Sequence, residues 1–364
     1  MKIMHYAGLD VHKKMIAYCV KTPRGRLVEE GQVPATRKAL SEWVERFRKP
    51  LGVAMEATLF TGWIFDFFCE HAAEVKVAHP QMLKAIACSK KKNDRLDAEK
   101  ICDLYRMDML PECYMMPGDL RELRTTLRFR NLLVRTTTQY KNKCAGLLME
   151  VGAEYEKKRL HGKRYFAELM ETVEDVPESV KFMARHCHEI LHSFSAMQRQ
   201  IIATLNKHPE IRERVELLRT IPGVGEILAL TWALEIGDPH RFGSGRKVIS
   251  YIGLCSEQRE SAGKSWRGPL SKKRNKHLQT KMIEVAKLAP SWNEELAAVH
   301  ARAAAKGNAN RATLEVARHL ARLLLAVDKS GQPYDPERWR QTGKALSREA
   351  GATRPHTPRA RARA

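Results

Sequence analysis

The first 110 residues alternate short apolar segments with segments of helical spacing. Three segments are patterned as strands, and the short polar turn Val11–Lys14 joins the first two. Five further segments then alternate between helix and strand patterns, and the helices place their large apolar residues on one face. The expected strands are residues 5–10, 15–20, 26–33, 51–57 and 75–78, and the expected helices are 34–48, 61–71 and 94–105.

Three strands of antiparallel type, followed by this alternation, predict a mixed sheet with helices on its faces. The same order of elements is found in RNase H-like domains. Asn93 stands immediately before the last helix and is a good N-cap, because its side-chain oxygen can accept a hydrogen bond from the first turn. The predicted fold of this region is therefore α/β.

Residues 118–220 contain few turn signals and many charged residues, with leucines scattered among them. Leu120, Leu123 and Leu127 have heptad-like spacing, although polar residues interrupt the pattern further along. We expect two long helices, folded as an antiparallel coiled-coil hairpin with a turn near Glu174–Pro177.

A third region begins with Ile221-Pro222-Gly223-Val224-Gly225 and continues as an apolar helix over 227–236. A stretch rich in Gly, Ser and basic residues follows, and more helix is expected from 276 to about 325. The chain ends in Pro, Ala and Arg, a composition typical of disordered tails. The predicted domains are 1–112, 118–218 and a mainly helical 219–330, with a disordered basic tail at 341–364.

Basic residues outnumber acidic residues by 64 to 42, which gives a formal net charge of +22. The excess is concentrated late in the chain. Residues 241–287 hold 12 basic and three acidic residues, whereas residues 1–110 hold 19 basic and 14 acidic residues. This charge favours a nucleic-acid partner, because each Lys or Arg that neutralises a phosphate releases counterions. With 43% apolar residues the chain can bury a core, which excludes wholesale disorder.

Other sequence features exclude several classes of protein. No apolar run approaches the length of a membrane helix, so no membrane partner is expected. The charge at Asp10 precedes any apolar stretch that a signal peptide needs, which disfavours secretion. The eight cysteines include no C-x-x-C pair, which disfavours a disulfide scaffold or a Cys-type zinc site. We expect a cytoplasmic protein.

Four acidic residues stand where predicted strands end or a helix begins. Asp10 and Glu56 each end an apolar strand, and Asp94 and Asp97 share one face of a helix's first turn. A buried strand has little use for a terminal carboxylate unless that group is solvated or bound. Taken singly, Asp94 is equally a carboxylate stabilised by the helix dipole, and Asp97 a solvated surface residue.

Brought together, these carboxylates would repel one another, and bound cations would relieve the repulsion. Mg²⁺ is the expected cofactor, because it prefers hard oxygen ligands and shares phosphate oxygens. Two such ions about 4 Å apart can clamp a scissile phosphate. The pattern alone does not separate a nuclease from a transposase.

Two later motifs are rich in glycine and serine. The 221–225 segment is typical of a helix–hairpin–helix module, in which backbone N–H groups near Gly223 and Gly225 approach a phosphate; an ordinary turn is the alternative. Ser261 stands in a basic Ser-Ala-Gly segment expected to be an open loop, where the positive field would favour a serine attacking phosphorus. Such a loop more often binds phosphate without chemistry, and no suitably placed histidine offers itself as a base.

The combination resembles the DEDD transposases of bacterial insertion sequences, the Piv/MooV-related IS one-ten family. The resemblance covers about residues 5–326. The matching stretches are Gly8–His12, Met55–Thr58, His79-Pro80, Lys92–Ala98, Ile221–Gly225, Phe242–Ser244, Tyr251–Leu254, Ser261–Lys264 and Ser271–Lys273.

The resemblance implies a RuvC-like first domain, a helical coiled-coil insert and a transposase domain, in a bacterial enzyme that cuts and rejoins DNA. It implies that Asp10, Glu56, Asp94 and Asp97 form a catalytic tetrad that binds Mg²⁺. It implies that Ser261 is the nucleophile and forms a covalent phosphoserine intermediate. Family membership further implies a structured non-coding RNA that bridges double-stranded donor and target DNA. The protein would act as a homo-oligomer, from dimer to tetramer, with a composite active site.

The residues expected to hold nucleic acid are Gly223, Gly225, Lys264, Arg267, Lys272, Lys273 and Lys276. The sequence departs from the family where Cys255-Ser256 replaces a frequent Val-Pro or Thr-Pro, so Ser256 is the other candidate nucleophile. One alternative function is a RuvC-like, structure-specific nuclease that uses water and needs no Ser261. Another is a nucleic-acid-binding protein without catalysis.

Overall fold

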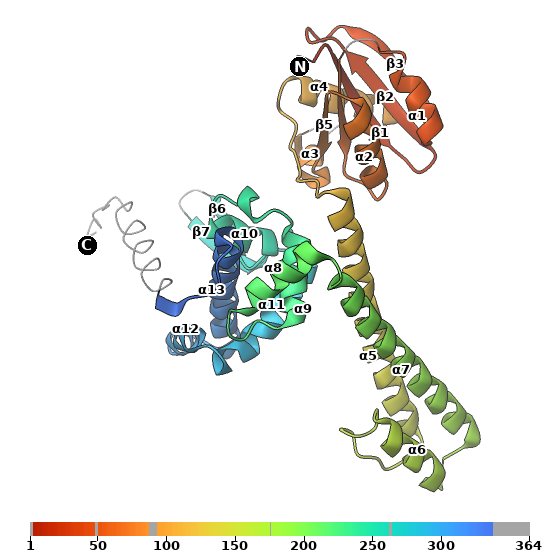
Figure 1. Ribbon diagram of the computed structural model, residues 1–364, viewed down its shortest axis with the longest axis vertical. Coiled ribbons are helices and arrows are strands. Elements are labelled where there is room, and N and C mark those ends of the chain that lie inside the picture. The colour runs from red at the N-terminus through yellow and green to blue at the C-terminus, as the bar shows by residue number, and fades with distance from the viewer. Residues whose placement is uncertain (1–2, 48–49, 87–92, 175, 262–263, 338–364) are drawn as a thin grey trace, which may run out of the picture. The chain divides into compact units, whose positions relative to one another are not determined.

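The computed structural model describes residues 3–47, 50–86, 93–174, 176–261 and 264–337 (Figure 1). Contacts within the chain divide it into two compact units, Met1–Asp119 and the remainder from Leu120 onward. Each unit has hydrophobic cores of its own. The predicted tail at 341–364 lies outside the described residues.

A five-stranded mixed sheet forms the centre of the first unit, in the order β3-β2-β1-β4-β5. β2 pairs antiparallel with β1 and β3, whereas β4 pairs parallel with β1 and β5. The predicted mixed α/β fold is confirmed for this region. The strands are β1 (His5–Val11), β2 (Met15–Lys21), β3 (Leu27–Pro34), β4 (Leu51–Glu56) and β5 (Glu74–Ala78).

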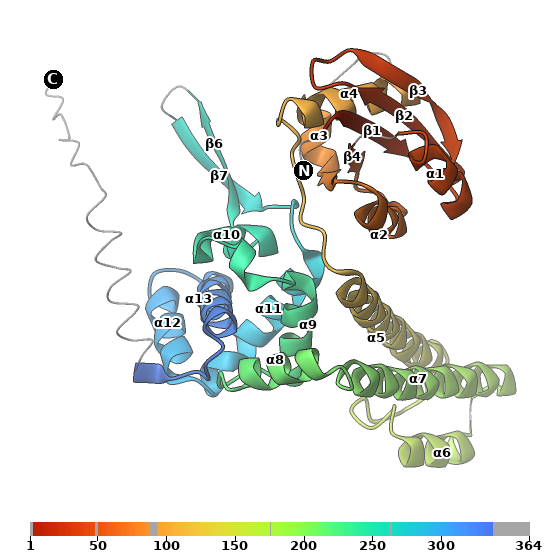
Figure 2. The ribbon, with the colours of Figure 1, turned by 45° about the horizontal axis from the view of Figure 1, so that its top comes forward.

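Helices cover both faces of this sheet, as Figures 1 and 2 show. Leu9 and Met55 belong to the core beneath α1 and α2. Ala54 faces the other way and packs with Ile101 of α4, because successive side chains of a strand point to opposite faces. The helices are α1 (Arg37–Val44), α2 (Thr61–His71), α3 (Pro80–Ile86) and α4 (Asp94–Arg106).

The short helix α3 is absent from the sequence-based prediction, in which His79-Pro80 marks only the end of a strand. Pro80 is the first residue of α3. A proline is tolerated there because the first N–H groups of a helix have no partner within it. The predicted N-cap of α4 is confirmed, since the side chain of Asn93 accepts a hydrogen bond from the N–H of Arg95 at 3.1 Å.

Gly8 brings α4 into direct contact with β1. A Cβ atom at this position would lie 2.2 Å from the carbonyl oxygen of Ala98 and 2.3 Å from the backbone nitrogen of Cys102. The buried Lys21 of β2 adds two ion pairs to partly exposed carboxylates of the same helix, 2.7 Å to Asp103 and 2.9 Å to Glu99. The first turn of α4 is therefore held close to the end of β1.

Two long helices, α5 (Gly118–Glu150) and α7 (Glu178–Leu205), run side by side in opposite directions in the second unit (Figures 1 and 2). Midway along α5, Gln198 of α7 donates a hydrogen bond to Thr137 at 2.9 Å. Nearer the end of α5, Cys144 and Ala184 share a small core. The antiparallel pair agrees with the sequence-based expectation.

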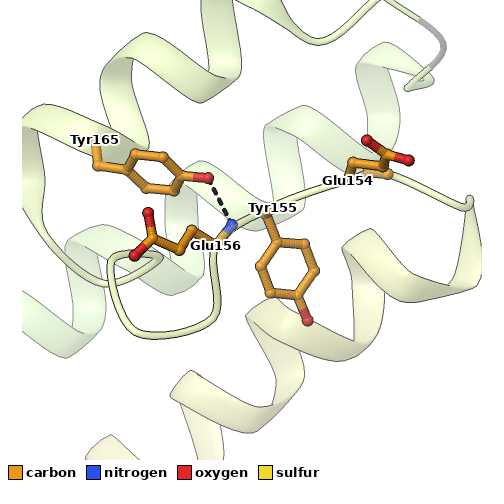
Figure 3. A pocket seen from close by; sticks show the side chains of 5 residues that line it. Glu154, Tyr155, Glu156 and Tyr165 are labelled. Carbon is orange, nitrogen blue, oxygen red and sulfur yellow. Dashed lines mark hydrogen bonds between the residues drawn. The ribbon is translucent and has the colours of Figure 1, made fainter.

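The connection between these helices is longer than predicted, because α5 ends at Glu150 and not near residue 174. Gly152 has a φ of +72°, a conformation that ends helices and suits glycine. A further helix, α6 (Lys163–Thr172), precedes α7. Figure 3 shows how the intervening segment is held, with the backbone N–H of Glu156 donating to the hydroxyl of Tyr165 at 2.7 Å.

The apolar helix α9 (Glu226–Ile236) is central to the larger core of the second unit, and all its residues from 228 to 236 are buried. Leu127 of α5 and Leu205 of α7 join this core. Although α9 is apolar, no helix among the described residues is long and apolar enough to span a membrane. The surrounding helices are α8 (Pro209–Arg219), α10 (Gly245–Ile252), α11 (Lys276–Leu288), α12 (Glu294–Ala304) and α13 (Ala309–Ser330), with 3₁₀ turns at Pro239–Arg241 and Ala289–Ser291.

The basic Gly- and Ser-rich stretch is a β-hairpin, formed by β6 (Ser256–Ser261) and β7 (Lys264–Leu270). The prediction of an open loop was wrong here, although the third region is otherwise helical. Cross-strand pairs such as Gln258 with Arg267 join mostly polar residues. An apolar alternation, which signals a half-buried strand, is therefore missing from the sequence.

Candidate functional site

Three side chains from the end of a strand, a turn and the start of a helix meet in the first unit. Asp10 lies near the end of β1, His12 follows in the turn to β2, and Asp94 is the first residue of α4. The Nε2 atom of His12 lies 3.2 Å from a carboxylate oxygen of Asp10 and 3.5 Å from one of Asp94. One possible ligand atom from each residue lies within 4.8 Å of the others. This acid cluster has the spacing to share one cation.

The surroundings of Asp10 disfavour the charged form of its carboxylate. Burial raises the pKa of Asp10 above its ordinary value of 3.8, and the charges of Asp94 and Asp97 raise it further. His12 lowers the same pKa through its charge and its hydrogen bond. The side chain of Asp10 is 14% exposed, whereas that of Asp94 is 49% exposed. The cluster is thus buried on the sheet side and open on the helix side.

Glu56 lies beside Asp10 at the carboxyl ends of adjacent parallel strands. Leu9 of β1 pairs with Met55 of β4, so the next residue of each strand, Asp10 and Glu56, stand at the same level. Each follows a side chain that points to the α1–α2 face, so both point to the α4 face.

Asp97 lies on the side of α4 that faces β4. It precedes Ile101 by one helical turn, and Ile101 packs on Ala54 of that strand. An oxygen of Asp97 is 3.0 Å from the Nζ atom of Lys100. The structure therefore brings Asp10 and Asp94 into one close group, and places Glu56 and Asp97 on the same face near the same end of the sheet.

His12 is absent from the sequence-based list of site residues. A signal was available, because His12 stands two residues after Asp10 and residues at this spacing share a face of an extended chain. The hydrogen bond from its backbone N–H to the carbonyl of Met15, 3.0 Å, fixes the turn that presents it.

The candidate serines occupy opposite ends of β6 in the second unit. Ser261 is the last residue of the strand, is exposed, and pairs with Lys264 across the hairpin. Ser256 is the first residue and lines a pocket together with Arg246, Arg318 and Arg322. The hairpin therefore separates the two candidates along one strand.

The predicted nucleic-acid-binding residues lie at the hairpin and at two helix starts. Gly223 and Gly225 lie in the turn between α8 and α9, where Gly223 has a φ of +90° and Gly225 is the N-cap of α9. A Cβ atom at Gly225 would meet open space. Lys264 and Arg267 are in β7, with side chains outside the described part, and Lys272, Lys273 and Lys276 are exposed before and at the start of α11.

Two family models match this chain. Residues 7–152 match a DEDD transposase model of the IS110 type, and residues 215–301 match the family described as Transposase IS116/IS110/IS902. The first match contains the acid cluster, and the second contains both candidate serines. The chain belongs to the IS110 family of transposases.

Curated relatives agree with this assignment. The transposase for insertion sequence element IS1111A of Coxiella burnetii is 27% identical over 79% of this chain and 78% of its own length. The transposase for IS1328 of Yersinia enterocolitica is 27% identical over 66% of this chain and 71% of its own length. A putative transposase of Sinorhizobium fredii is 25% identical over 77% of this chain and 70% of its own length. This IS110-family transposase is therefore an enzyme that acts on DNA.

Proposed function

We propose that this transposase cuts and rejoins DNA at the ends of an insertion sequence and at its target, with Mg²⁺ at the acid cluster and a serine as nucleophile. The donor set fits such an ion, since carboxylate oxygens of Asp10 and Asp94 converge and Glu56 and Asp97 lie at the same end of the sheet. Carboxylate oxygens are the ligands that Mg²⁺ prefers. A divalent ion bound there would neutralise phosphate charge and orient the phosphate for in-line attack.

The side chains of the cluster have distinct roles in this proposal. Asp10 and Asp94 supply oxygens from a rigid strand and from the first turn of a helix, and Glu56 and Asp97 complete the tetrad. His12 orients the carboxylate of Asp10 through its 3.2 Å hydrogen bond. An oriented carboxylate needs little reorganisation when its ligand arrives.

Ser261 supplies the nucleophile. Its Oγ atom attacks phosphorus and forms an O–P bond, while the bond to the deoxyribose oxygen breaks and that oxygen leaves with the electron pair and takes up a proton. The serine proton passes to solvent. Because the phosphodiester is replaced by a phosphoserine ester, bond energy is conserved for rejoining. The exposed place of Ser261 at the end of β6 supports this role.

Nucleic acid is held by the basic second unit, and a structured RNA bridges donor and target DNA. Gly223 and Gly225 offer backbone N–H groups at the start of α9 to a phosphate. Exposed Lys272, Lys273 and Lys276 contribute charge, as do Lys264 and Arg267 of β7. The active complex is a homo-oligomer, dimer to tetramer, in which the acid cluster and Ser261 act on one phosphate.

The convergence of Asp10 and Asp94 carries the proposal, because two carboxylates from distant parts of the chain meet within reach of one cation. The test uses the full chain, RNA transcribed from the element and DNA carrying an element end, with Mg²⁺. A denaturing gel should reveal a protein–DNA adduct. Ser261→Ala and Asp10→Asn should each abolish the adduct, and Ser256→Ala should retain it.

Two outcomes would contradict parts of the proposal. An adduct that survives Ser261→Ala excludes this serine as the nucleophile. Full strand cleavage by Ser261→Ala without any adduct favours the water-using nuclease. Omitting the RNA tests guidance, since adduct formation at the element end should then cease.

The composite site has its own test. Asp10→Asn and Ser261→Ala are each inactive alone under the proposal. When the two variants are mixed before assembly, an oligomer that combines one intact acid cluster with one intact serine should restore the adduct. No restoration would contradict a site shared between subunits.

A further inference from the structure

The pocket at the foot of the hairpin is lined by three arginines and by two neutral polar residues. It has a volume of about 350 Å³ and lies where β6 begins, between α10 and α13. Arg246 comes from α10, and Arg318 and Arg322 come from α13. Ser256 and Gln258 of β6 complete the polar lining. Ile249 and Cys255 also line the pocket, and its described lining includes no carboxylate.

Two of these arginines lack a counter-charge in the part of the chain that the structure describes. Within the described residues, the guanidinium groups of Arg246 and Arg322 make no hydrogen bond or ion pair, and both side chains are exposed. Gly245 allows this arrangement, because the stem of Arg322 lies 3.0 Å from where a Cβ of residue 245 would be. Two unpaired guanidinium groups therefore border the same cavity.

The third arginine is held in place. The Nε atom of Arg318 donates a hydrogen bond to the carbonyl of Leu254 at 2.8 Å, and its Nη1 atom pairs with Glu315 on the same helix. Arg318 is half-buried, so it joins the pocket floor to the chain segment that enters β6. A fixed arginine beside two free ones forms a site that is organised before its ligand binds.

We propose that this pocket binds a backbone phosphate of nucleic acid. The planar guanidinium group presents paired N–H donors that match phosphate oxygens, and Ser256 and Gln258 add neutral donors. The ligand is a phosphodiester, because the pocket lies in an enzyme that acts on DNA and at the foot of a hairpin that belongs to the most basic region, residues 241–287. This inference does not depend on the acid cluster or on Ser261.

The geometry of β6 separates this phosphate from one at Ser261. Five residue steps of extended chain span about 16 Å, which corresponds to about five phosphates along one strand of a duplex. The pocket therefore anchors nucleic acid away from the proposed site of attack. Ser256 is a binding residue in this arrangement.

The test is the salt dependence of binding, since each phosphate contact contributes to the slope of log K against log salt. The double variant Arg246→Gln/Arg322→Gln removes the two exposed guanidinium groups and leaves Arg318 in place. The probes are a short DNA duplex and an RNA duplex of the same sequence. The slope should fall by about one for at least one probe, with weaker binding at low salt.

The matched control is Arg212→Gln, which removes an exposed arginine of α8 outside the pocket. The slope of log K against log salt should be the same for Arg212→Gln as for the unmodified protein. Circular dichroism should show that both variants fold as the unmodified protein does. A smaller slope with only one of the two probes identifies that nucleic acid, DNA or RNA, as the source of the phosphate. Unchanged slopes with both probes would overturn the inference. The serine adduct test is separate, so failure here leaves the nucleophile assignment standing.

Discussion

The acid cluster and the serine hairpin are two candidate reaction centres built in different ways. The acid cluster lies where α4 packs against the sheet, and the missing side chain of Gly8 lets the helix backbone approach β1 closely. Asp10 is largely buried there. The hairpin is a two-stranded element with an exposed serine at its end and pocket arginines at its foot. The difference teaches that groups of like charge need a rigid support, whereas an uncharged nucleophile needs access.

The largest effect should come from Gly8→Val. Its side chain would enter the space of the α4 backbone at Ala98 and Cys102, and overpacking against backbone costs about 3 kcal/mol or more. Thermal unfolding should show loss of the folded first unit. The matched control is Gly146→Ala in α5, where a Cβ meets nothing and the helix should gain about 0.5–1 kcal/mol. A Gly8→Val protein with unchanged melting would show that α4 can move away from β1.

The support of the hairpin region is tested by Arg128→Ala. Glu235 of α9 is fully buried, and both its oxygens accept hydrogen bonds from Arg128 at 2.7 Å, while Asn275 donates to it at 2.8 Å. Removing Arg128 leaves a buried charge and should cost about 3 kcal/mol in urea unfolding. Arg164→Ala breaks an exposed pair with Glu168 and should cost less than about 1 kcal/mol. Equal costs would mean that Glu235 finds water or another partner.

The comparison predicts that substituting the two catalytic candidates affects stability differently in metal-free protein: one substitution stabilises the fold and the other leaves its stability unchanged. Because the pKa of Asp10 is raised in the fold, the unfolded chain releases this proton first as pH rises above 3.8. The free energy of unfolding therefore falls as pH rises from 3.8 to the raised pKa of Asp10, and it stays at the lower value at higher pH. Asp10→Asn should therefore raise Tm at neutral pH. Ser261→Ala, an exposed change, should leave Tm unaltered, and a lower Tm for Asp10→Asn would contradict this account.

Among the substitutions expected to destabilise the protein, a small effect should come from Trp266→Ala in β7. Trp266 is 58% exposed, so little apolar area is lost, and a cross-strand pair of this kind contributes less than about 1 kcal/mol. Urea unfolding should change little, and nucleic-acid binding at low salt reports any loss of hairpin shape. A cost near that of Arg128→Ala would show that the hairpin is packed more tightly than its exposure indicates.

Much of the first unit follows from the sequence, because its strands and helices bury apolar faces. The continuous apolar run at 15–20 and the spacing of the large apolar residues at 61–71 predict the strand and the helix that the structure contains there. The hairpin strands at 256–261 and 264–270 have no such apolar pattern, since their residues are mostly polar. Backbone pairing, which leaves no mark on hydropathy, decides that structure.

The sequence by itself predicted Asp10 and Asp94 as members of one site, since a carboxylate at the end of an apolar strand is costly without a ligand and both residues lie in stretches that match the family. It also located the basic region and both serines. Tertiary structure alone decided that His12 bonds to Asp10, that Glu56 stands level with Asp10, and that arginines of α10 and α13 share a pocket. These facts depend on strand register and helix packing, which join residues that are far apart along the chain and have no common local pattern.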